Sequence, residues 1–257
     1  MIDLSIVIPT VNRAACLERA ISAIPAATQA TCELVIVDGG STDVTGDLLS
    51  RAQHALGNRL QVIREPERQG FVRAVNRGFR AARGRFVTWM NDDAWPLPGA
   101  FDRAIEQLSF SPRTVGMAAL FHPSRSPKNI AFEAQHLGRP FRLLHVRGTL
   151  YANFGVAPRT LFERLGYFDE RYFLYGADPD FSLKVWHSGL SVVPAFGALL
   201  DHDELQDDRR EADRDRGVED NQKLFAKWDL PPRSDDANDF DQTRPCTLRG
   251  IRTARAA

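Results

Sequence analysis

The stretch FVTWMNDDAWP (residues 86–96) places two adjacent carboxylates, Asp92 and Asp93, directly after a run of apolar and β-branched residues. The run is typical of a buried strand, and Trp95-Pro96 predicts a turn beyond it. Neighbouring negative charges repel each other, so a compensating group is expected. Water is sufficient at a surface turn, whereas a divalent cation with a phosphate ligand would give the pair a function. Taken alone, the stretch leaves both interpretations open.

Strand-like and helix-like segments alternate on the amino-terminal side of this stretch. Apolar residues recur at helical spacing in two segments, and Gly84 is a plausible C-cap of the second. The predicted strands are residues 4–8, 33–37, 60–65 and 85–90, and the predicted helices are residues 12–24 and 70–84. This alternation predicts an α/β fold with a mostly parallel central sheet and helices on both faces.

Polar residues follow three of the predicted strands. Thr10 follows the first strand, Asp38 the second, and Asp92 and Asp93 the fourth. Ligands of such sheets bind beyond the carboxyl ends of the strands. The sequence therefore predicts that these side chains share one rim, which favours a binding site over a solvated turn.

The second half is less regular. Residues 115–120 and 190–194 resemble strands, residues 149–158 look extended, and residues 122–142 predict a loop-rich excursion. The predicted helices are residues 158–166, a segment from about Pro179 to Gly189 with Asp178 as N-cap, and residues 217–228. The polar segment 231–257 predicts a partly disordered tail.

Composition excludes several classes of protein. Lys plus Arg equals Asp plus Glu at 33 each, so no dedicated nucleic-acid binding is expected. The three cysteines are widely spaced, which favours a reducing, cytoplasmic location over a disulfide framework. No signal peptide or transmembrane segment is predicted, and peripheral membrane contact stays open. The absence of G-x-G-x-x-G and of a P-loop disfavours Rossmann dehydrogenases and P-loop NTPases.

Several motifs, in order, resemble the inverting glycosyltransferases of family 2, which have the GT-A fold. The motifs are SIVIPTVNR (5–13), ELVIVDGGSTD (33–43), GFVRAVNRGFRAARGRFVTWMNDD (70–93) and LGYFDERYFLYGADPDFSLKVWHSGL (165–190). The N-D-D form is most similar to a rhamnosyltransferase-like branch. The resemblance covers roughly residues 4 to 230 and implies a single GT-A domain over 1–230, with a nucleotide-sugar-binding half (1–97) and an acceptor-side half (98–230).

The resemblance also implies roles for matching positions. Donor-binding residues would be Pro9, Thr10, Arg13, Asp38 and Asp92; metal ligands would be Asp93 and His202; the catalytic base would be Asp178; secondary or acceptor-side positions would be Asp180 and Trp89. Elementary chemistry agrees, because a single displacement at a sugar carbon needs one base for the acceptor hydroxyl and one cation for the leaving diphosphate.

Structural alternatives exist for the same residues. The sequence is also compatible with purely structural roles. Asp178 could be a helix N-cap and Asp38 could close a turn, while His202 could be a solvated histidine and Trp89 a core residue. Arg209 and Arg210 either close over the diphosphate or belong to a solvated charge run. The chain also departs from the family, since Ala177 replaces the glutamate before the base and Gly39 replaces an acidic or amide residue.

The sequence thus predicts an inverting, metal-dependent glycosyltransferase that uses Mn²⁺ or Mg²⁺. It would move a hexosyl or deoxyhexosyl group from a UDP-, dTDP- or GDP-linked donor to a hydroxyl of a glycan or lipid-linked acceptor, as in polysaccharide biosynthesis. Ala177 supports an alternative, a non-catalytic nucleotide-sugar-binding protein of the same fold. A nucleotidylyltransferase is disfavoured because PTVNR (9–13) replaces the Gly-rich basic loop expected after the first strand.

Overall fold

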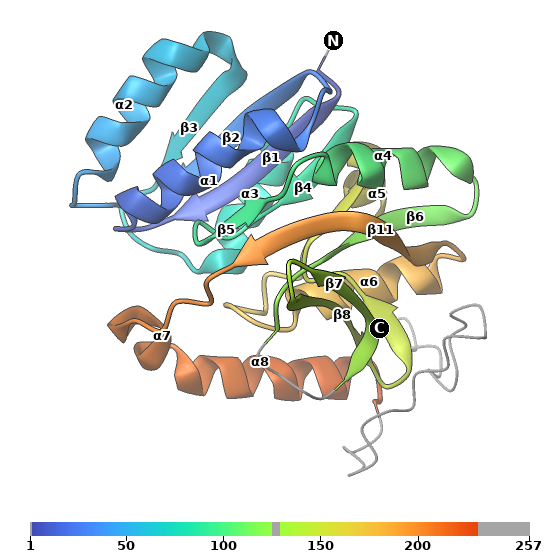
Figure 1. The fold of residues 1–257 in the computed structure, drawn as a ribbon. Helices are drawn as coiled ribbons and strands as arrows, with labels where there is room; N and C mark the ends of the chain where they lie inside the picture. The colour runs from blue at the N-terminus through green and yellow to red at the C-terminus, as the bar shows by residue number, and fades with distance from the viewer. Residues whose placement is uncertain (1, 125–128, 231–257) are drawn as a thin grey trace.

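The computed structural model describes residues 2–124 and 129–230, apart from the side chain of residue 209. The tail predicted for 231–257 lies outside the described residues. An eight-stranded sheet runs through the described part of the chain in the order β3-β2-β1-β4-β10-β6-β11-β5, and a three-stranded sheet, β7-β8-β9, lies beside it (Figure 1).

The elements follow one another closely along the chain. The strands are β1 (Leu4–Thr10), β2 (Cys32–Asp38), β3 (Leu60–Arg64), β4 (Phe86–Trp89), β5 (Ala94–Pro96), β6 (Val115–Phe121), β7 (Ile130–His136), β8 (Arg139–Val146), β9 (Thr149–Tyr151), β10 (Gly155–Pro158) and β11 (Ser191–His202). The helices are α1 (Ala14–Ala27), α2 (Thr45–Leu56), α3 (Phe71–Ala81), α4 (Ala100–Phe110), α5 (Arg159–Leu165), α6 (Ala177–His187), α7 (Asp208–Ala212) and α8 (Arg214–Lys227), with a 3₁₀ turn, η1 (Gly57–Arg59).

The amino-terminal half of the large sheet is parallel, as predicted. Strand β1 pairs in parallel with β2 and β4, and β2 pairs in parallel with β3. Beyond β4 the sheet is mixed, because β10 is antiparallel to β4 and β6, and β5 is antiparallel to β11. Strands β6 and β11 are again parallel. Both halves of the chain therefore contribute to one sheet.

Helices cover both faces of this sheet, which confirms the predicted α/β architecture. Alternate residues of β1 enter different cores: Val7 packs with α3, α5 and α6, whereas Ile6 and Ile8 pack with α1, α2 and α4. A strand that is buried on both faces consists almost entirely of apolar residues, and the LSIVI run has that composition. The period-two alternation of the strand thus divides the apolar residues between the two faces.

Close approach of α3 to β1 depends on Gly78. A Cβ built on this residue would lie 2.2 Å from Val7 Cγ1. We expect Gly78→Ala to destabilise the protein by about 1–3 kcal/mol, because the added methyl group overpacks a filled core. Urea unfolding measures this, with Gly46→Ala in α2 as the control, since the Cβ at Gly46 meets nothing within 4 Å. Equal stability of the two variants would contradict the predicted overpacking.

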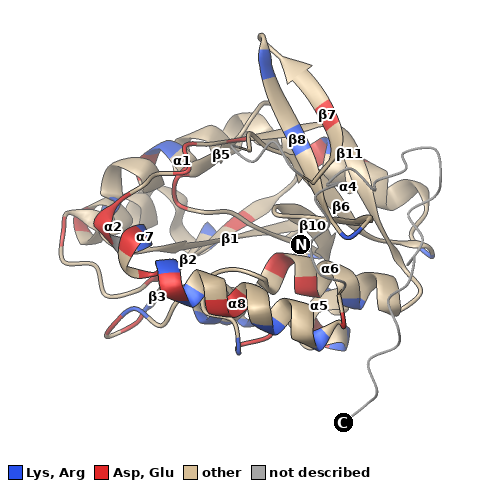
Figure 2. Ribbon diagram, turned by 90° about the horizontal axis from the view of Figure 1, so that it is seen from below, with Lys and Arg blue, Asp and Glu red and all other residues tan. Residues whose placement is uncertain are grey.

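The loop-rich excursion predicted for residues 122–142 is wrong. Apart from residues 125–128, which lie outside the described part, this region forms the hairpin of β7 and β8, which projects from the molecule (Figure 2). Leu137 and Gly138 both have positive φ at the hairpin tip, as two-residue hairpin turns require. The Gly at this tip was the sequence signal for the hairpin.

Several smaller expectations also need correction. The turn predicted at Trp95-Pro96 is the short strand β5. Helices α2 and α4 were not predicted, although apolar residues of α4 have helical spacing, namely Phe101, Ala104, Ile105 and Leu108. Helix α3 ends at Ala81 rather than at Gly84, which instead lies against the backbone of β1. Helix α6 begins at Ala177 behind the N-cap residue Gly176, so the expectation that Asp178 caps the helix is wrong.

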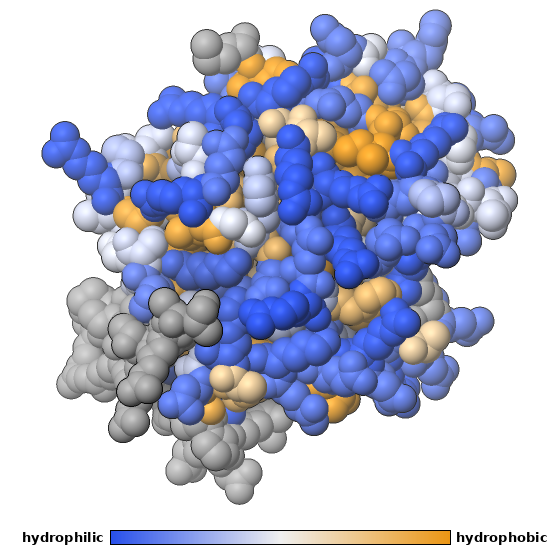
Figure 3. Space-filling view, turned by 180° about the vertical axis from the view of Figure 1, so that it is seen from behind, coloured by the Kyte–Doolittle hydropathy of each residue, from blue (hydrophilic) through white to orange (hydrophobic). Residues whose placement is uncertain are grey.

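Charged residues are distributed over many elements of the fold, and both signs are mixed (Figure 2). Acidic and basic residues alternate along α8 (Figure 2), and hydrophobic residues on the face opposite Figure 1 occur in separated patches among hydrophilic ones (Figure 3).

Within the described ranges, none of the helices combines the length and the apolar character that a bilayer-crossing segment needs.

Candidate functional site

The ends of β1 and β4 bring the predicted donor-binding residues together. Pro9, Thr10, Arg13, Asp92 and Asp93 line one cavity at the carboxyl ends of these strands. Thr10 Oγ1 donates a hydrogen bond of 2.9 Å to Asp92 Oδ2. Asp38 is paired in register with Thr10, so it lies on the same rim, as predicted. There Asp38 Oδ1 accepts a 2.9 Å hydrogen bond from Ser41 N, which means that Asp38 also closes a turn.

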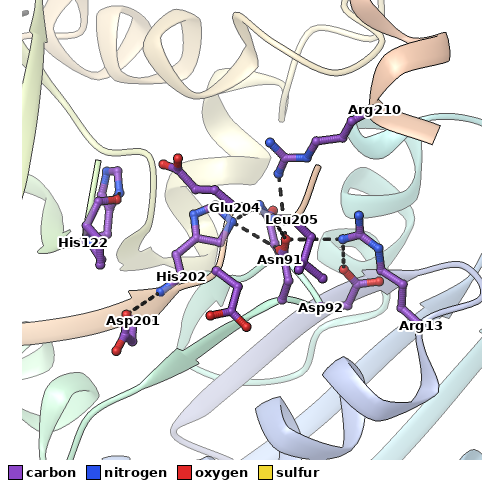
Figure 4. A network of polar contacts seen from close by, with 12 residues as sticks. Arg13, Asn91, Asp92, His122, Asp201, His202, Glu204, Leu205 and Arg210 are labelled. Carbon is purple, nitrogen blue, oxygen red and sulfur yellow. Dashed lines mark hydrogen bonds and ion pairs between the residues drawn. The ribbon is translucent and has the colours of Figure 1, made fainter. Parts of the chain in front are cut away.

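Arginine compensates the two adjacent carboxylates. Arg13 Nη1 lies 3.0 Å from Asp92 Oδ1 and 3.3 Å from Asp93 Oδ2, and both aspartates are buried. Burial acts to raise the pKa of Asp93, but hydrogen bonds from His202 and Leu205 and the charge of Arg13 outweigh it and hold that pKa well below its usual range. Both carboxylates thus have a cationic neighbour within the cavity, and Figure 4 shows Arg13 beside Asp92.

His202 is brought to Asp93 by the pairing of β11 with β5. His202 is in register with Ala94, the residue after Asp93. As a result, His202 Nε2 lies 3.2 Å from Asp93 Oδ1. Ligands bonded to one ion at roughly 2.1 Å and at right angles lie about 3 Å apart, so the two atoms are spaced as neighbouring ligands. A carboxylate oxygen and an imidazole nitrogen fit a divalent cation, and the alternative of a solvated histidine is not supported.

Asp178 lies in the first turn of α6. Asn153 Nδ2 lies 3.3 Å from Asp178 Oδ2, and Ser182 Oγ donates to Asp178 O at 2.8 Å and accepts from Ala152 N at 3.1 Å. The residue keeps some exposed surface, but its carboxyl group is enclosed, and burial raises the pKa of Asp178 to about 7 despite the hydrogen bonds from its own N–H and from Asn153. A carboxylate with such a pKa suits proton transfer near neutral pH.

Two predicted secondary residues point into the core. Asp180 is 0% exposed, and its Oδ1 lies 2.7 Å from both Trp228 Nε1 and Lys227 Nζ. Trp89 is 1% exposed and donates its Nε1–H to Asn153 O at 2.9 Å. The expectation that these residues face an acceptor is therefore wrong in this structure. They instead hold α8 and the β9–β10 connection in place.

The segment between β11 and α8 contributes Arg210, which the sequence left open, and two residues that no motif indicated, Leu205 and Asp207. Asp207 Oδ2 pairs with Arg13 Nη2 at 2.5 Å, and Leu205 N donates to Asp93 Oδ2 at 3.0 Å. Arg210 Nη2 lies 4.0 Å from Asp93 Oδ2 and lines the same cavity, as do Arg68 and Asp213, which form an ion pair. The placement of Arg210 favours the interpretation in which it reaches the diphosphate.

His122 and Asn153 also escaped the sequence analysis, because they lie in irregular segments without a motif. His122 Nδ1 lies 2.7 Å from Pro123 O, and His122 Nε2 lies 3.0 Å from Asn153 Oδ1. Burial, assisted by His202, lowers the pKa of His122 to about 4, although both hydrogen bonds oppose the shift. His122 and Asn153 connect the region of His202 to Asp178.

Residues 5–166 match the family model described as Glycosyl transferase family 2. The chain belongs to glycosyl transferase family 2. A Mycobacterium tuberculosis protein named PGL/p-HBAD biosynthesis glycosyltransferase Rv2957 is 42% identical over 89 residues, which are 35% of this chain and 34% of that protein. A Campylobacter jejuni GalNAc(5)-diNAcBac-PP-undecaprenol beta-1,3-glucosyltransferase is 30% identical over 107 residues, 42% of this chain and 35% of the other. The matches thus span about a third of each curated relative's length.

Solved structures share the fold. The mannosyltransferase PcManGT from Pyrobaculum calidifontis, in complex with GDP-Man and Mn²⁺, has a TM-score of 0.67 at 22% identity over 90% of this family 2 chain and 65% of its own. GalNAc-T7 with UDP, GalNAc and Mn²⁺ has a TM-score of 0.68 at 16% identity over 89% of this chain and 48% of its own. The family 2 chain therefore has the predicted GT-A fold.

Proposed function

We propose that this family 2 member is an inverting glycosyltransferase that moves a sugar from a nucleoside-diphosphate donor to an acceptor hydroxyl. The observation that supports this best is the 3.2 Å pairing of His202 Nε2 with Asp93 Oδ1 beside Arg13 and Asp92, on the rim where GT-A folds bind donors. The activity also agrees with the names of the relatives and with the nucleotide sugars and Mn²⁺ in the titles of the fold neighbours.

In this proposal the donor lies along the cavity at the ends of β1 and β4. Pro9, Thr10, Arg13, Asp38 and Asp92 contact the nucleoside and the diphosphate, and Arg210 reaches the diphosphate from the opposite side. Asp93 and His202 hold Mn²⁺ or Mg²⁺. When bound, such an ion neutralises charge that develops on the leaving diphosphate.

Asp178 acts as the base of a single displacement. The acceptor oxygen forms a bond to the anomeric carbon while the bond from that carbon to the diphosphate oxygen breaks. The electron pair leaves with the nucleoside diphosphate, and the hydroxyl proton passes to the Asp178 carboxylate. Asn153 accepts a hydrogen bond from Trp89 through its backbone carbonyl and donates to Asp178 through its side-chain amide, which keeps that carboxylate in one orientation.

The finer assignments belong to the same proposal. The resemblance and the relatives' names support these finer proposals. The donor carries uridine, thymidine or guanosine and a hexosyl or deoxyhexosyl group. The enzyme belongs to a rhamnosyltransferase-like branch, and its acceptor is a glycan or a lipid-linked molecule. We also propose that residues 1–230 act as one domain, since strands from both halves join one sheet. The cytoplasmic location stays a prediction.

Ala177 supports the alternative of a non-catalytic nucleotide-sugar-binding protein. It is 0% exposed at the first position of α6, next to Asp178, where the family pattern has a glutamate. This alternative keeps the donor cavity and differs from the enzyme only in turnover.

Calorimetric titration of UDP, dTDP and GDP, each with Mn²⁺ and with EDTA, tests the donor site. We expect tight binding of one nucleotide and a loss of affinity of at least about 10-fold in EDTA, because an ion held by Asp93 and His202 would supply the positive charge that attracts the diphosphate. Absence of binding for all three in both conditions would contradict the proposed function. Release of nucleoside diphosphate from a donor sugar then separates the enzyme from the binding protein, and release of pyrophosphate would indicate a nucleotidylyltransferase.

A further inference from the structure

A second group of metal-ligating side chains lies on the side of His202 away from Asp92 and Arg13 (Figure 4). His122 follows β6, His202 ends β11, and Glu204 lies two residues further along (Figure 4). Ligand atoms of these three residues, one from each, all lie within 4.8 Å of one another. His122 is 4% exposed, so the group lies at least partly beneath the surface.

The contacts of His122 fix which ring nitrogen can bind a metal. Its Nδ1 lies 2.7 Å from Pro123 O, and a carbonyl oxygen can only accept a hydrogen bond. Nδ1 therefore carries the proton of the neutral ring, and Nε2 presents a lone pair. Metal-binding histidines in proteins commonly donate their other N–H to a backbone carbonyl in this way, which fixes the tautomer and the orientation of the ring.

The lone pair of His122 Nε2 faces another acceptor. Asn153 Oδ1 lies 3.0 Å away, and its orientation is set because Asn153 Nδ2 lies 3.3 Å from Asp178 Oδ2 and donates to it. Two acceptors at this separation need a shared positive partner. A cation beside both atoms provides one, since neighbouring ligands of one ion lie about 3 Å apart.

We propose that His122, His202 and Glu204 bind a zinc ion at a second site, which shares His202 with the Asp93 site. Two imidazoles and one carboxylate are a ligand set that zinc uses in proteins. Imidazole nitrogen favours zinc over Mg²⁺ and Mn²⁺, which prefer oxygen ligands. Asn153 Oδ1 is positioned to serve as a further, weaker ligand beside His122.

Sharing of His202 makes the two sites antagonistic. A neutral imidazole has one ring nitrogen with a free lone pair, so a His202 ring that binds zinc through one nitrogen carries its proton on the other and cannot also bind the ion at Asp93. Zinc is therefore expected to weaken Mn²⁺-dependent nucleotide binding. This antagonism rests on the proposed function, whereas the zinc site itself does not.

Calorimetric titration of the metal-free chain of residues 1–257 with Zn²⁺ tests the site. We expect one tight binding event, weakened at least about 10-fold by His122→Ala and by Glu204→Gln. Glu204→Gln keeps the shape of a partly exposed side chain, so it remains decisive if His122→Ala fails to fold. Asp203→Asn is the matched control, because Asp203 forms an exposed pair with Arg19 in the same segment, and it should leave zinc affinity within about twofold.

The outcomes separate this inference from the proposed function. Absence of tight zinc binding, or affinity that Glu204→Gln leaves unchanged, overturns the zinc site. Asp93→Asn should keep zinc binding and lose Mn²⁺-dependent nucleotide binding. If zinc binds as expected but no nucleotide binds to the unmodified chain, the proposed function fails and the zinc site stands.

Discussion

Replacement of Asp178 by asparagine is expected to lower the rate of sugar transfer by about 10³-fold. General base catalysis contributes roughly 10²- to 10⁴-fold, and asparagine keeps the shape of the side chain but cannot take the acceptor proton. Nucleotide affinity should change little, because Asp178 is not among the residues that line the donor cavity. Release of nucleoside diphosphate measures the rate, and calorimetry measures the affinity.

The pH dependence provides a second readout for Asp178. The base must be ionised, and the pKa of Asp178 is raised to about 7 by burial, so kcat/KM should increase with pH through about 7. An aspartate with an ordinary pKa would give a rate that is flat above about pH 5. The residual activity of Asp178→Asn should lack this rise.

Stability distinguishes loss of the base from loss of structure. Because the folded-state pKa lies above the unfolded value of about 3.9, the stabilising effect of protonated Asp178 is complete below that value and is lost as the pH rises through about 7. Asparagine resembles the protonated form, so Asp178→Asn should be at least as stable as the unmodified chain at pH 8. A variant that transfers sugar at the normal rate would exclude Asp178 as the base.

Asp93→Asn is expected to weaken Mn²⁺-dependent nucleotide binding by at least about 100-fold, or about 2.7 kcal/mol. The variant removes the negative charge that faces the ion, and the amide is a poor ligand beside His202. Addition of EDTA should then make little further difference. Calorimetric titration of the preferred nucleotide with and without Mn²⁺ measures both effects.

The contacts of Arg13 indicate that Asp93→Asn will fold. Arg13 keeps Asp92 at 3.0 Å and Asp207 at 2.5 Å, so its buried charge stays paired. Asp203→Asn, which removes an exposed carboxylate from the same region, serves as the control and should bind nucleotide normally. Retention of Mn²⁺-dependent affinity in Asp93→Asn would rule out Asp93 as a metal ligand.

Much of the first half of the fold was predictable because local pattern and tertiary position agree there. A run such as LSIVI is apolar on both faces, which happens where helices cover both sides of a parallel sheet. The irregular second half was harder to predict, because hairpins such as β7–β8 gain stability from packing and cross-strand pairs that appear only in three dimensions.

The direction in which side chains point could not be predicted from motif position. Asp178 and Asp180 are two residues apart in α6, yet Asp180 is fully enclosed by Trp228, Lys227 and Tyr172. Residues two apart on a helix lie on different faces, so the helix turns one carboxylate toward Asn153 and the other toward α8.

The sequence by itself determined the parallel arrangement of β1 to β4 and the rim on which Thr10, Asp38 and Asp92 lie, because parallel strands share one carboxyl edge. The sequence connected His202 to Asp93 only through the family resemblance, and the contact between them, across 109 residues, depends on tertiary structure. That meeting depends on the antiparallel register of β5 and β11, which non-local hydrogen bonds set and no local pattern encodes. The contacts of Arg13 with Asp207 and of His122 with Asn153 have the same origin, since each joins segments that only the folded sheet brings together.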